Sequence, residues 1–311
     1  MPTDIIQKLR NKNARAISKL ISHVENEENN FHNVISDLYP HLGNAYKIGI
    51  TGPPGAGKST ITDKLIEVFR QKKMSVAIIA IDPSSPFTGG SILGDRIRFI
   101  NDLRDPNLFF RSMSTRGAQG GLSKSAMYVA DIFDASGYDI IIFETVGVGQ
   151  IEIDVIEAVD TVIVTLVPES GDDIQMMKSG LIEIADLYVI NKSDRDGADN
   201  LYASLNKFLQ FNKDSEWTPK ILKTIALNGL GIEELYNNIL IHKDFLNREN
   251  ISTKKINDRY LKSVKSFIAD KLNKDFWSTN SDMKDSLELE MKLDYRKRMP
   301  PFKMAEKILK L

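Results

Sequence analysis

Short apolar runs alternate with amphipathic segments through residues 45–245 of the chain. Several runs are rich in Ile and Val and have no polar face, which is typical of strands buried on both sides in a parallel sheet. The segments between them carry apolar residues at helical spacing. The pattern therefore predicts an α/β fold, a doubly wound and mostly parallel sheet with helices on both faces. The predicted strands are YKIGIT (46–51), SVAIIAI (75–81), LFFR (108–111), YDIIIFE (138–144), TVIVTLV (161–167), DLYVIN (186–191) and ILKTIA (221–226).

Helical patterns flank this region on both sides. Apolar residues recur at helical spacing near the N-terminus, and a polar hinge, NRENISTKKIND, precedes an apolar stripe that begins at Ile256 and ends at Leu272. A last helix, opened by proline, is predicted in PPFKMAEKILKL. The sequence thus predicts an N-terminal helical extension (1–44), an α/β domain (45–245) and a C-terminal helical arm (246–311).

Composition and charge exclude several classes of function. The chain has 311 residues and a formal net charge of −1, so we expect no nucleic-acid or membrane partner. No apolar run reaches the roughly 18 residues of a membrane span, and the charged N-terminus lacks a secretory core, which favours a cytoplasmic protein. The absence of cysteine excludes disulfides, thiolate zinc sites and iron–sulfur clusters within this chain. The histidines have no metal-binding spacing and are interpreted as surface or cap residues: His23, His32, His41 and His242.

The strongest chemical signal is GPPGAGKST, residues 52–60, which lies between a predicted strand and an amphipathic segment. Its glycines let backbone N–H groups surround phosphates, and the following helix N-terminus favours an anion. Lys58 is expected to neutralise the β- and γ-phosphates of a nucleotide, and the Ser59 hydroxyl to bind Mg²⁺. The predicted phosphate site comprises Gly52, Pro53, Pro54, Gly55, Ala56, Gly57, Lys58, Ser59 and Thr60.

A second predicted element supplies a carboxylate to the metal. Glu144 ends the apolar strand YDIIIFE, and Gly147 follows three residues later. This is similar to the Asp-x-x-Gly element of nucleotide switches, with Glu in place of Asp. The carboxylate of Glu144 could hold Mg²⁺ directly or through water, and the N–H of Gly147 could sense the γ-phosphate.

A third element, NKSD at 191–194, follows the strand DLYVIN and indicates guanine specificity. Asp194 can accept hydrogen bonds from guanine N1–H and the 2-amino group, and adenine has neither donor. Lys192 would lie against the base, and Asn191 would brace the loops. Ala226, expected to end the strand ILKTIA, could offer its backbone N–H to guanine O6. The cofactors predicted from these motifs are GTP or GDP with Mg²⁺.

The stretches between these motifs are more particular. Together and in order, they resemble the MeaB/ArgK-like GTPases, the family associated with methylmalonyl-CoA mutase. The resemblance covers nearly the whole chain and is weakest after about residue 245. The stretches that carry it are IAIDPSSPFTGGSILGDRIRF (79–99), SMSTRGAQGGLS (112–123), FETVGVGQIEIDV (143–155) and VPESGDDIQMMKSGLIEIAD (167–186).

The resemblance implies a P-loop GTPase domain and a GTP-hydrolysing chaperone for an adenosylcobalamin-dependent acyl-CoA mutase. Members of this family protect the mutase and gate its cofactor loading, and they are usually homodimers joined through C-terminal helices. It also implies that the segment ESGDDIQMMKSG (169–180) is a mobile loop that communicates with the mutase. An ordinary solvated loop remains an alternative for that segment.

Two aspartates fit the same picture. Asp82 ends the strand SVAIIAI and Asp95 follows a glycine-rich loop, so both could approach Mg²⁺ beside Ser59 and Glu144. Asp82 could instead start an Asp-Pro turn, and Asp95 could cap a helix. Lys58, Glu144 and Asp82 are the candidate catalytic residues. Because no residue is an obvious base for the attacking water, we expect slow hydrolysis that the mutase accelerates.

Other functions remain as alternatives. The ArgK name suggests an ATPase or kinase associated with lysine, arginine and ornithine transport, but NKSD favours guanine over adenine. A nickel or zinc metallochaperone would rely on Cys and His clusters that this sequence lacks. A signal-recognition GTPase would need an apolar peptide-binding domain, for which residues 246–311 are short and highly charged.

Overall fold

The computed structural model describes residues 3–26, 28, 30–82, 105–114, 121–145, 159–170, 183–211, 216–294 and 297–309. Contacts divide the chain into two compact units, Met1–Glu249 and Asn250–Leu311. The first unit therefore contains both the predicted N-terminal extension and the predicted α/β domain.

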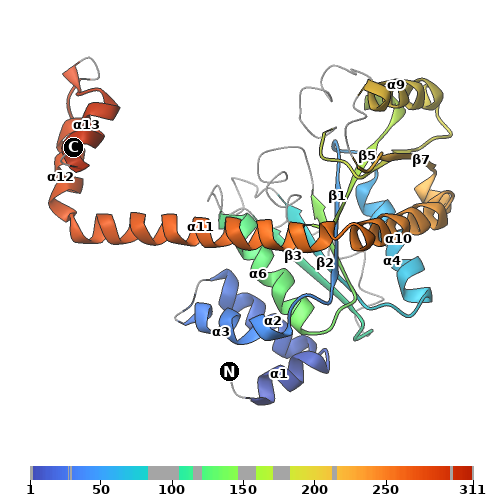
Figure 1. The fold of residues 1–311 in the computed structure, drawn as a ribbon, viewed down its shortest axis with the longest axis horizontal. Coiled ribbons are helices and arrows are strands. Elements are labelled where there is room, and N and C mark those ends of the chain that lie inside the picture. The colour runs from blue at the N-terminus through green and yellow to red at the C-terminus, as the bar shows by residue number, and fades with distance from the viewer. Residues whose placement is uncertain are drawn as a thin grey trace. The chain divides into compact units, whose positions relative to one another are not determined.

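The first unit is built on a seven-stranded sheet in the order β3-β2-β4-β1-β5-β6-β7 (Figure 1). Each described strand pair is parallel. From β1 the sheet continues through β5 and β6 to β7 on one side, and through β4 and β2 to β3 on the other, so β4 lies between β1 and β2. The predicted doubly wound α/β fold is confirmed. The strands are β1 (Tyr46–Thr51), β2 (Val76–Asp82), β3 (Leu108–Ser114), β4 (Ile140–Thr145), β5 (Thr161–Leu166), β6 (Leu187–Asn191) and β7 (Lys220–Thr224).

The strand boundaries differ from the prediction at polar entries. Ser75 and Asp139 were predicted within strands, but they directly precede β2 and β4, and the Ser75 hydroxyl donates to the Asp139 carboxylate at 2.7 Å. β3 extends to Ser114 because it pairs with β2 along its whole length. The prediction that Ala226 ends a strand is wrong. β7 ends at Thr224, and Ala226 begins a short 3₁₀ helix, η3 (Ala226–Asn228).

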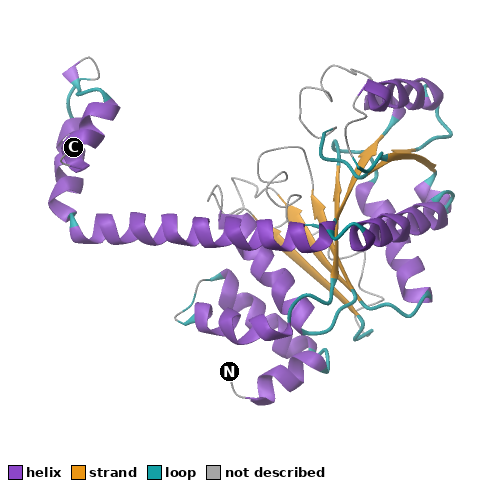
Figure 2. Cartoon of the chain, in the orientation of Figure 1, coloured by secondary structure: helices purple, strands orange, loops and turns teal. Residues whose placement is uncertain are grey.

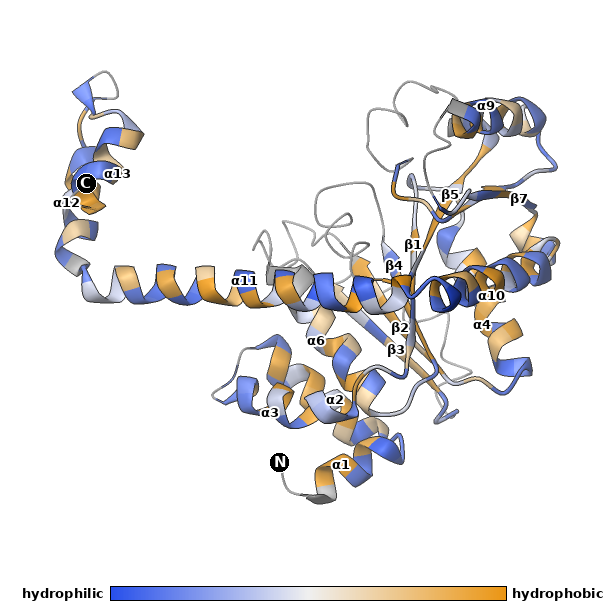
Figure 3. Cartoon of the chain, in the orientation of Figure 1, coloured by the Kyte–Doolittle hydropathy of each residue, from blue (hydrophilic) through white to orange (hydrophobic). Residues whose placement is uncertain are grey.

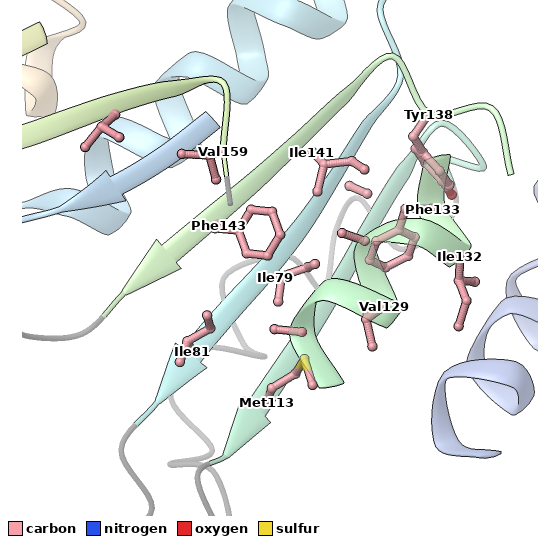
Figure 4. Close-up of a cluster of buried hydrophobic side chains, with 14 of the residues drawn as sticks. Ile79, Ile81, Met113, Val129, Ile132, Phe133, Tyr138, Ile141, Phe143 and Val159 are labelled. Atoms are coloured by element: carbon pink, nitrogen blue, oxygen red, sulfur yellow. The ribbon is translucent and has the colours of Figure 1, made fainter. Parts of the chain in front are cut away.

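Helices cover both faces of the sheet (Figure 2). On one face, α6 (Gly121–Ala135) packs on β2, β3 and β4, and α9 (Ala198–Phe211) packs on β6 and β7. On the other face, α4 (Lys58–Gln71) and α10 (Ile232–Arg248) contact each other and the sheet. Figure 4 shows the core between α6 and the strands. It includes Ile79, Met113, Val129, Phe133, Tyr138, Ile141 and Phe143, each less than one-twentieth exposed.

The described part of the N-terminal extension contains the α-helices α1 (Thr3–Arg10), α2 (Ala14–Glu25) and α3 (Phe31–Leu38) and the 3₁₀ helix η1 (Tyr39–His41), which pack on α6. Their apolar side chains belong to the same buried cluster as α6 and the sheet. An ion pair between Arg111 of β3 and Glu25 of α2 joins the extension to the sheet edge. The extension is therefore an integral layer of the first unit.

The interpretation of His242 as a surface or cap residue is wrong. Its side chain is 1% exposed, and Nδ1 lies 2.8 Å from the hydroxyl of Thr161. The ring also packs on Trp217. The helix pattern carried this signal, since His242 falls in the apolar stripe of α10 with Leu235, Ile239 and Leu246.

The second unit is helical, with α11 (Ile251–Thr279), α12 (Ser281–Met291) and α13 (Pro301–Leu309). The predicted polar hinge is largely wrong, because its residues from Ile251 onward form the first turns of α11. Polar residues such as Lys and Asn lie on a solvated helix without breaking it. The described residues contain no helix with the length and apolarity that a membrane span requires.

Candidate nucleotide site

The loop at residues 52–57 connects β1 to the first residue of α4, Lys58. Two of its glycines cannot be replaced without a collision. A Cβ on Gly52 would lie 2.0 Å from a backbone carbonyl oxygen of β5, and one on Gly57 would lie 2.3 Å from Nδ2 of Asn191. Both glycines also have positive φ values, +140° and +88°. The loop therefore packs so closely on β5 and on the Asn191 side chain that neither glycine position has room for a side chain.

Lys58 lies at the N-terminus of α4 and is only 6% exposed. Its ammonium group donates to the carbonyl oxygens of Gly52 at 2.8 Å and Pro53 at 3.0 Å. The side chain thus folds back over its own loop. This arrangement concentrates a positive charge and the positive end of the helix dipole in the same loop, which suits the phosphates of a nucleotide.

Ser59 and Glu144 come together from α4 and β4. The Ser59 hydroxyl donates a hydrogen bond to Oε1 of Glu144. Glu144 reaches this position because β4 lies beside β1, with Ile50 and Glu144 in register. The pair offers one hydroxyl and one carboxylate, which are hard oxygen donors of the kind that Mg²⁺ takes from protein before phosphate and water complete its shell. The residues present therefore fit the metal.

Other predicted metal and switch residues are only partly within the described residues. Asp82 ends β2 next to β4, in register with Ser114, but its side chain lies outside the described residues. Asp95 and Gly147 also lie outside them, as do most residues of the 169–180 loop. The described part of the chain contains no group of three or more His, Asp or Glu side chains suited to a metal ion.

Asn191 connects three parts of the site and is 3% exposed. Its Nδ2 donates to the carbonyl of Ala56 at 2.9 Å in the phosphate loop. Its Oδ1 accepts from the hydroxyl of Thr224 at 3.0 Å and from the N–H of Ala226 at 3.1 Å. This is the bracing arrangement expected of Asn191. Thr224 was missed, although a small hydroxyl residue at the end of β7 is a signal that could have found it.

The remaining predicted base-site residues follow Asn191. Lys192 has a left-handed backbone, with φ +54°, and its ammonium donates to the carbonyl of Gly55 at 2.9 Å. Asp194 is exposed. The N–H of Ala226 already donates to Asn191, so a bond to guanine O6 would have to share or replace that acceptor.

A further contact joins the loop that begins with NKSD (191–194) to the loop after β5. Arg195, next to Asp194, forms an ion pair with Glu169 in the short helix η2 (Pro168–Ser170). This hydrogen bond lowers the pKa of the Glu169 carboxyl below its usual value. Sequence reasoning missed the pair because its two residues lie on separate loops.

These residues gather at one edge of the sheet. β1, β4, β6 and β7 are parallel, so their carboxyl ends lie together and bring the phosphate loop, Glu144, Asn191 and Ala226 to a single place. Comparison with known families agrees with this geometry. The family described as methylmalonyl Co-A mutase-associated GTPase MeaB matches residues 14–281. The chain belongs to this family.

Individual relatives support the same assignment. A putative GTPase of Pyrococcus horikoshii is 43% identical over 310 residues, which cover 98% of this chain and 96% of the relative. GTPase ArgK of Escherichia coli is 42% identical over 220 residues, covering 68% of this chain and 66% of the relative. A crystal structure of a LAO/AO transport system kinase covers 99% of this chain and 96% of that chain, with a TM-score of 0.73. At 24% identity, that structure supports the fold alone.

The family assignment confirms the resemblance drawn from the sequence. The chain is a P-loop GTPase of the MeaB family, related to ArgK, and it binds a guanine nucleotide. The roles of individual residues in that site remain predictions from the motifs, now with a geometry that can be tested.

Proposed function

We propose that this GTPase is a cytoplasmic chaperone of an adenosylcobalamin-dependent acyl-CoA mutase of the methylmalonyl-CoA mutase type. In this proposal it protects the mutase and gates the loading of its cofactor. The observation that carries the proposal is the match of residues 14–281 to a family described as mutase-associated. The guanine-nucleotide motifs are consistent with a switch that needs no small-molecule phosphate acceptor.

The site suggests how the chain handles GTP. The phosphate loop surrounds the phosphates, Lys58 holds the β- and γ-phosphates, and Asp194 selects guanine. Ser59 and Glu144, with Asp82 and Asp95, would hold Mg²⁺, which neutralises charge on the transferring phosphate when bound. Gly147 would report the γ-phosphate to the neighbouring loops. Hydrolysis would then change how loops 82–98, 144–150 and 170–180 bind the mutase.

The decisive experiment measures GTP hydrolysis by the purified chain with and without a purified methylmalonyl-CoA mutase. We expect slow turnover alone and an increase of about tenfold or more with the mutase, because the partner orders the site. Binding to the mutase should also differ between GDP and a non-hydrolysable GTP analogue. Rapid turnover alone, unchanged by the mutase and without complex formation, would contradict the chaperone role.

Nucleotide choice separates this proposal from a transport-associated kinase or ATPase. We expect GDP to bind far more tightly than ADP, and a preference for ADP would favour the alternative. Lys58→Ala should weaken GDP binding by about 100-fold, since it removes a buried charge from the phosphate loop. Asp194→Asn should reduce the preference for guanine over adenine without the same loss of phosphate affinity.

The second unit supports a proposed homodimer. No described side chain of α11 is buried, and Figure 3 shows apolar positions recurring along this 29-residue helix. Such a continuous exposed stripe on a helix is typical of a surface that packs on another protein, and a second copy presents the same stripe. Its exposed apolar residues are Ile256, Tyr260, Leu261, Val264, Phe267, Ile268 and Leu272. Light scattering of the full chain should give twice the monomer mass of 35.0 kDa.

A further inference from the structure

Two buried threonines connect the end of β4, which contains Glu144, to the end of β1, which leads into the phosphate loop. The hydroxyl of Thr145 donates to the hydroxyl of Thr51 at 3.0 Å, and both side chains are fully buried. Thr145 directly follows Glu144, and Thr51 directly precedes Gly52. The hydroxyl pair is therefore adjacent in sequence both to the Glu144 carboxylate and to the phosphate loop.

Strand geometry places this pair on the opposite face of the sheet from the metal ligands. Ile141 and Phe143 point into the core beneath α6 (Figure 4), so Thr145 points to that face as well. Glu144 points to the other face, toward α4, where it meets the Ser59 hydroxyl. The end of β4 is thus held on one face through Thr145 and on the other face through Glu144.

The register explains why the threonine bond matters. The backbone pairing of β1 with β4 ends at Ile50 and Glu144, and Thr51 and Thr145 are the next residues on the two strands. Their hydroxyl bond extends the connection beyond the last paired position. Without it, the last residue of β4 could move relative to β1, and the Glu144 carboxylate would move with it.

We infer that Thr145, through Thr51, is a positioning residue that fixes the Glu144 carboxylate relative to the phosphate loop and so sets the affinity for Mg²⁺. The inference rests on the proposed role of Glu144 and Ser59 as metal ligands. It assigns a function to Thr145, the residue after Glu144, although the Thr145 side chain lies on the opposite face of the sheet from the metal ligands.

The test measures binding of a fluorescent, non-hydrolysable GTP analogue to the full chain as Mg²⁺ is titrated. Thr145→Val keeps the shape of the side chain but removes the hydroxyl. We expect the Mg²⁺ concentration for half-maximal tightening to rise about fivefold, the effect of one lost hydrogen bond on an adjacent ligand. Binding in excess EDTA should stay within about twofold of the wild-type value, because the phosphate loop itself is intact.

Four further variants make the result specific. Thr145→Ser should restore the wild-type Mg²⁺ requirement, because serine retains the hydroxyl. Thr51→Val should resemble Thr145→Val, and the double variant should be no worse than either single one, since both remove the same bond. Thr165→Val is the matched control. Thr165 is also fully buried, in β5, and its backbone carbonyl packs on Gly52. Its hydroxyl has no hydrogen-bond partner among the described residues, so replacing the side chain alone should leave the Mg²⁺ requirement unaltered.

Three results would overturn the inference. An unchanged Mg²⁺ requirement in Thr145→Val would show that the hydroxyl pair does not position Glu144. Equal shifts in Thr145→Val and Thr165→Val would show a general packing effect. Wild-type binding that does not respond to Mg²⁺ would remove the metal role and this inference together. The proposed chaperone role is tested separately, by the stimulation of GTP hydrolysis by the mutase and by the formation of a complex with it.

Discussion

The two helical ends of this chain carry the same kind of amphipathic pattern but have different environments. In the N-terminal extension, Ile17 and Ile21 of α2 are fully buried against the α6 layer. In α11, Phe267 and Ile268 are about half exposed, within a helix that has no buried described side chain. An apolar stripe therefore predicts a helix, but it does not say whether the same unit or another molecule covers it.

The difference follows from what lies next to each stripe. The extension and the start of β1 are joined to α6 by polar contacts as well as by apolar packing. The Asp134 carboxylate, 2% exposed, accepts the N–H groups of Gly43 at 2.8 Å and of Asn44 and Ala45 at 3.0 Å. Among the described residues of the second unit, none buries the side chains of the α11 stripe. The first pattern is buried within its own unit, and the second is exposed, as the proposed homodimer requires.

A matched pair of substitutions should separate these roles with the largest effect. Ile21→Asp places a charge in the core and should destabilise the first unit by about 4 kcal/mol or more. Ile268→Asp puts the same group on α11, where the residue is 51% exposed, and should halve the mass in solution while leaving the thermal midpoint nearly unchanged. Thermal unfolding and light scattering measure the two effects. Equal loss of stability in both variants would contradict the distinction.

A smaller effect is expected from the polar junction. Asp134→Ala leaves three backbone N–H groups of residues 43–45 without their acceptor, which should cost about 2–3 kcal/mol. The exposed Asp285 on α12 provides the control, and Asp285→Ala should change stability by less than about 0.5 kcal/mol. Urea unfolding of both variants gives the comparison. An Asp134→Ala protein as stable as the control would show that water replaces the carboxylate.

The smallest predicted effect is a pH dependence confined to the first unit. Burial raises the pKa of Asp131 on α6 to about 6, the charge of Asp134 adds to this, and Lys47, 3.8 Å away, opposes it. The carboxyl group of Asp131 therefore binds its proton more tightly in the native state than in the unfolded chain. The resulting stability is fully present below about pH 4, declines as pH rises, and is lost above about pH 6.

Asp131→Asn isolates this contribution. The stability of the wild type minus that of the variant should increase as pH falls from 7 to 4. Because the Asp131 side chain is 21% exposed, we expect a change of roughly 1 kcal/mol, less than full burial would give. Thermal midpoints measured across that range provide the test. A difference that does not vary with pH would contradict the raised pKa.

Much of the site could be predicted from the sequence because its motifs are local. GPPGAGKST and NKSD each fix a short backbone path next to a strand, and parallel strands bring their carboxyl ends together. Ala226 shows the limit of this reasoning. Its strand ends two residues earlier than the apolar pattern indicated, because Ile225 bonds back to Leu230 and turns the chain. His242 shows another limit, since its partner Thr161 lies 81 residues away.

The sequence by itself determined the alternation of strand and helix, the phosphate loop and the guanine motif. Periodicity and motif spacing are properties of neighbouring residues, and these suffice for such features. Only the tertiary structure decided which amphipathic helix is covered, that Asn191 braces Ala56 and Ala226, and that Thr51 bonds Thr145. Each of these depends on strand order and register, which bring distant residues within hydrogen-bond distance.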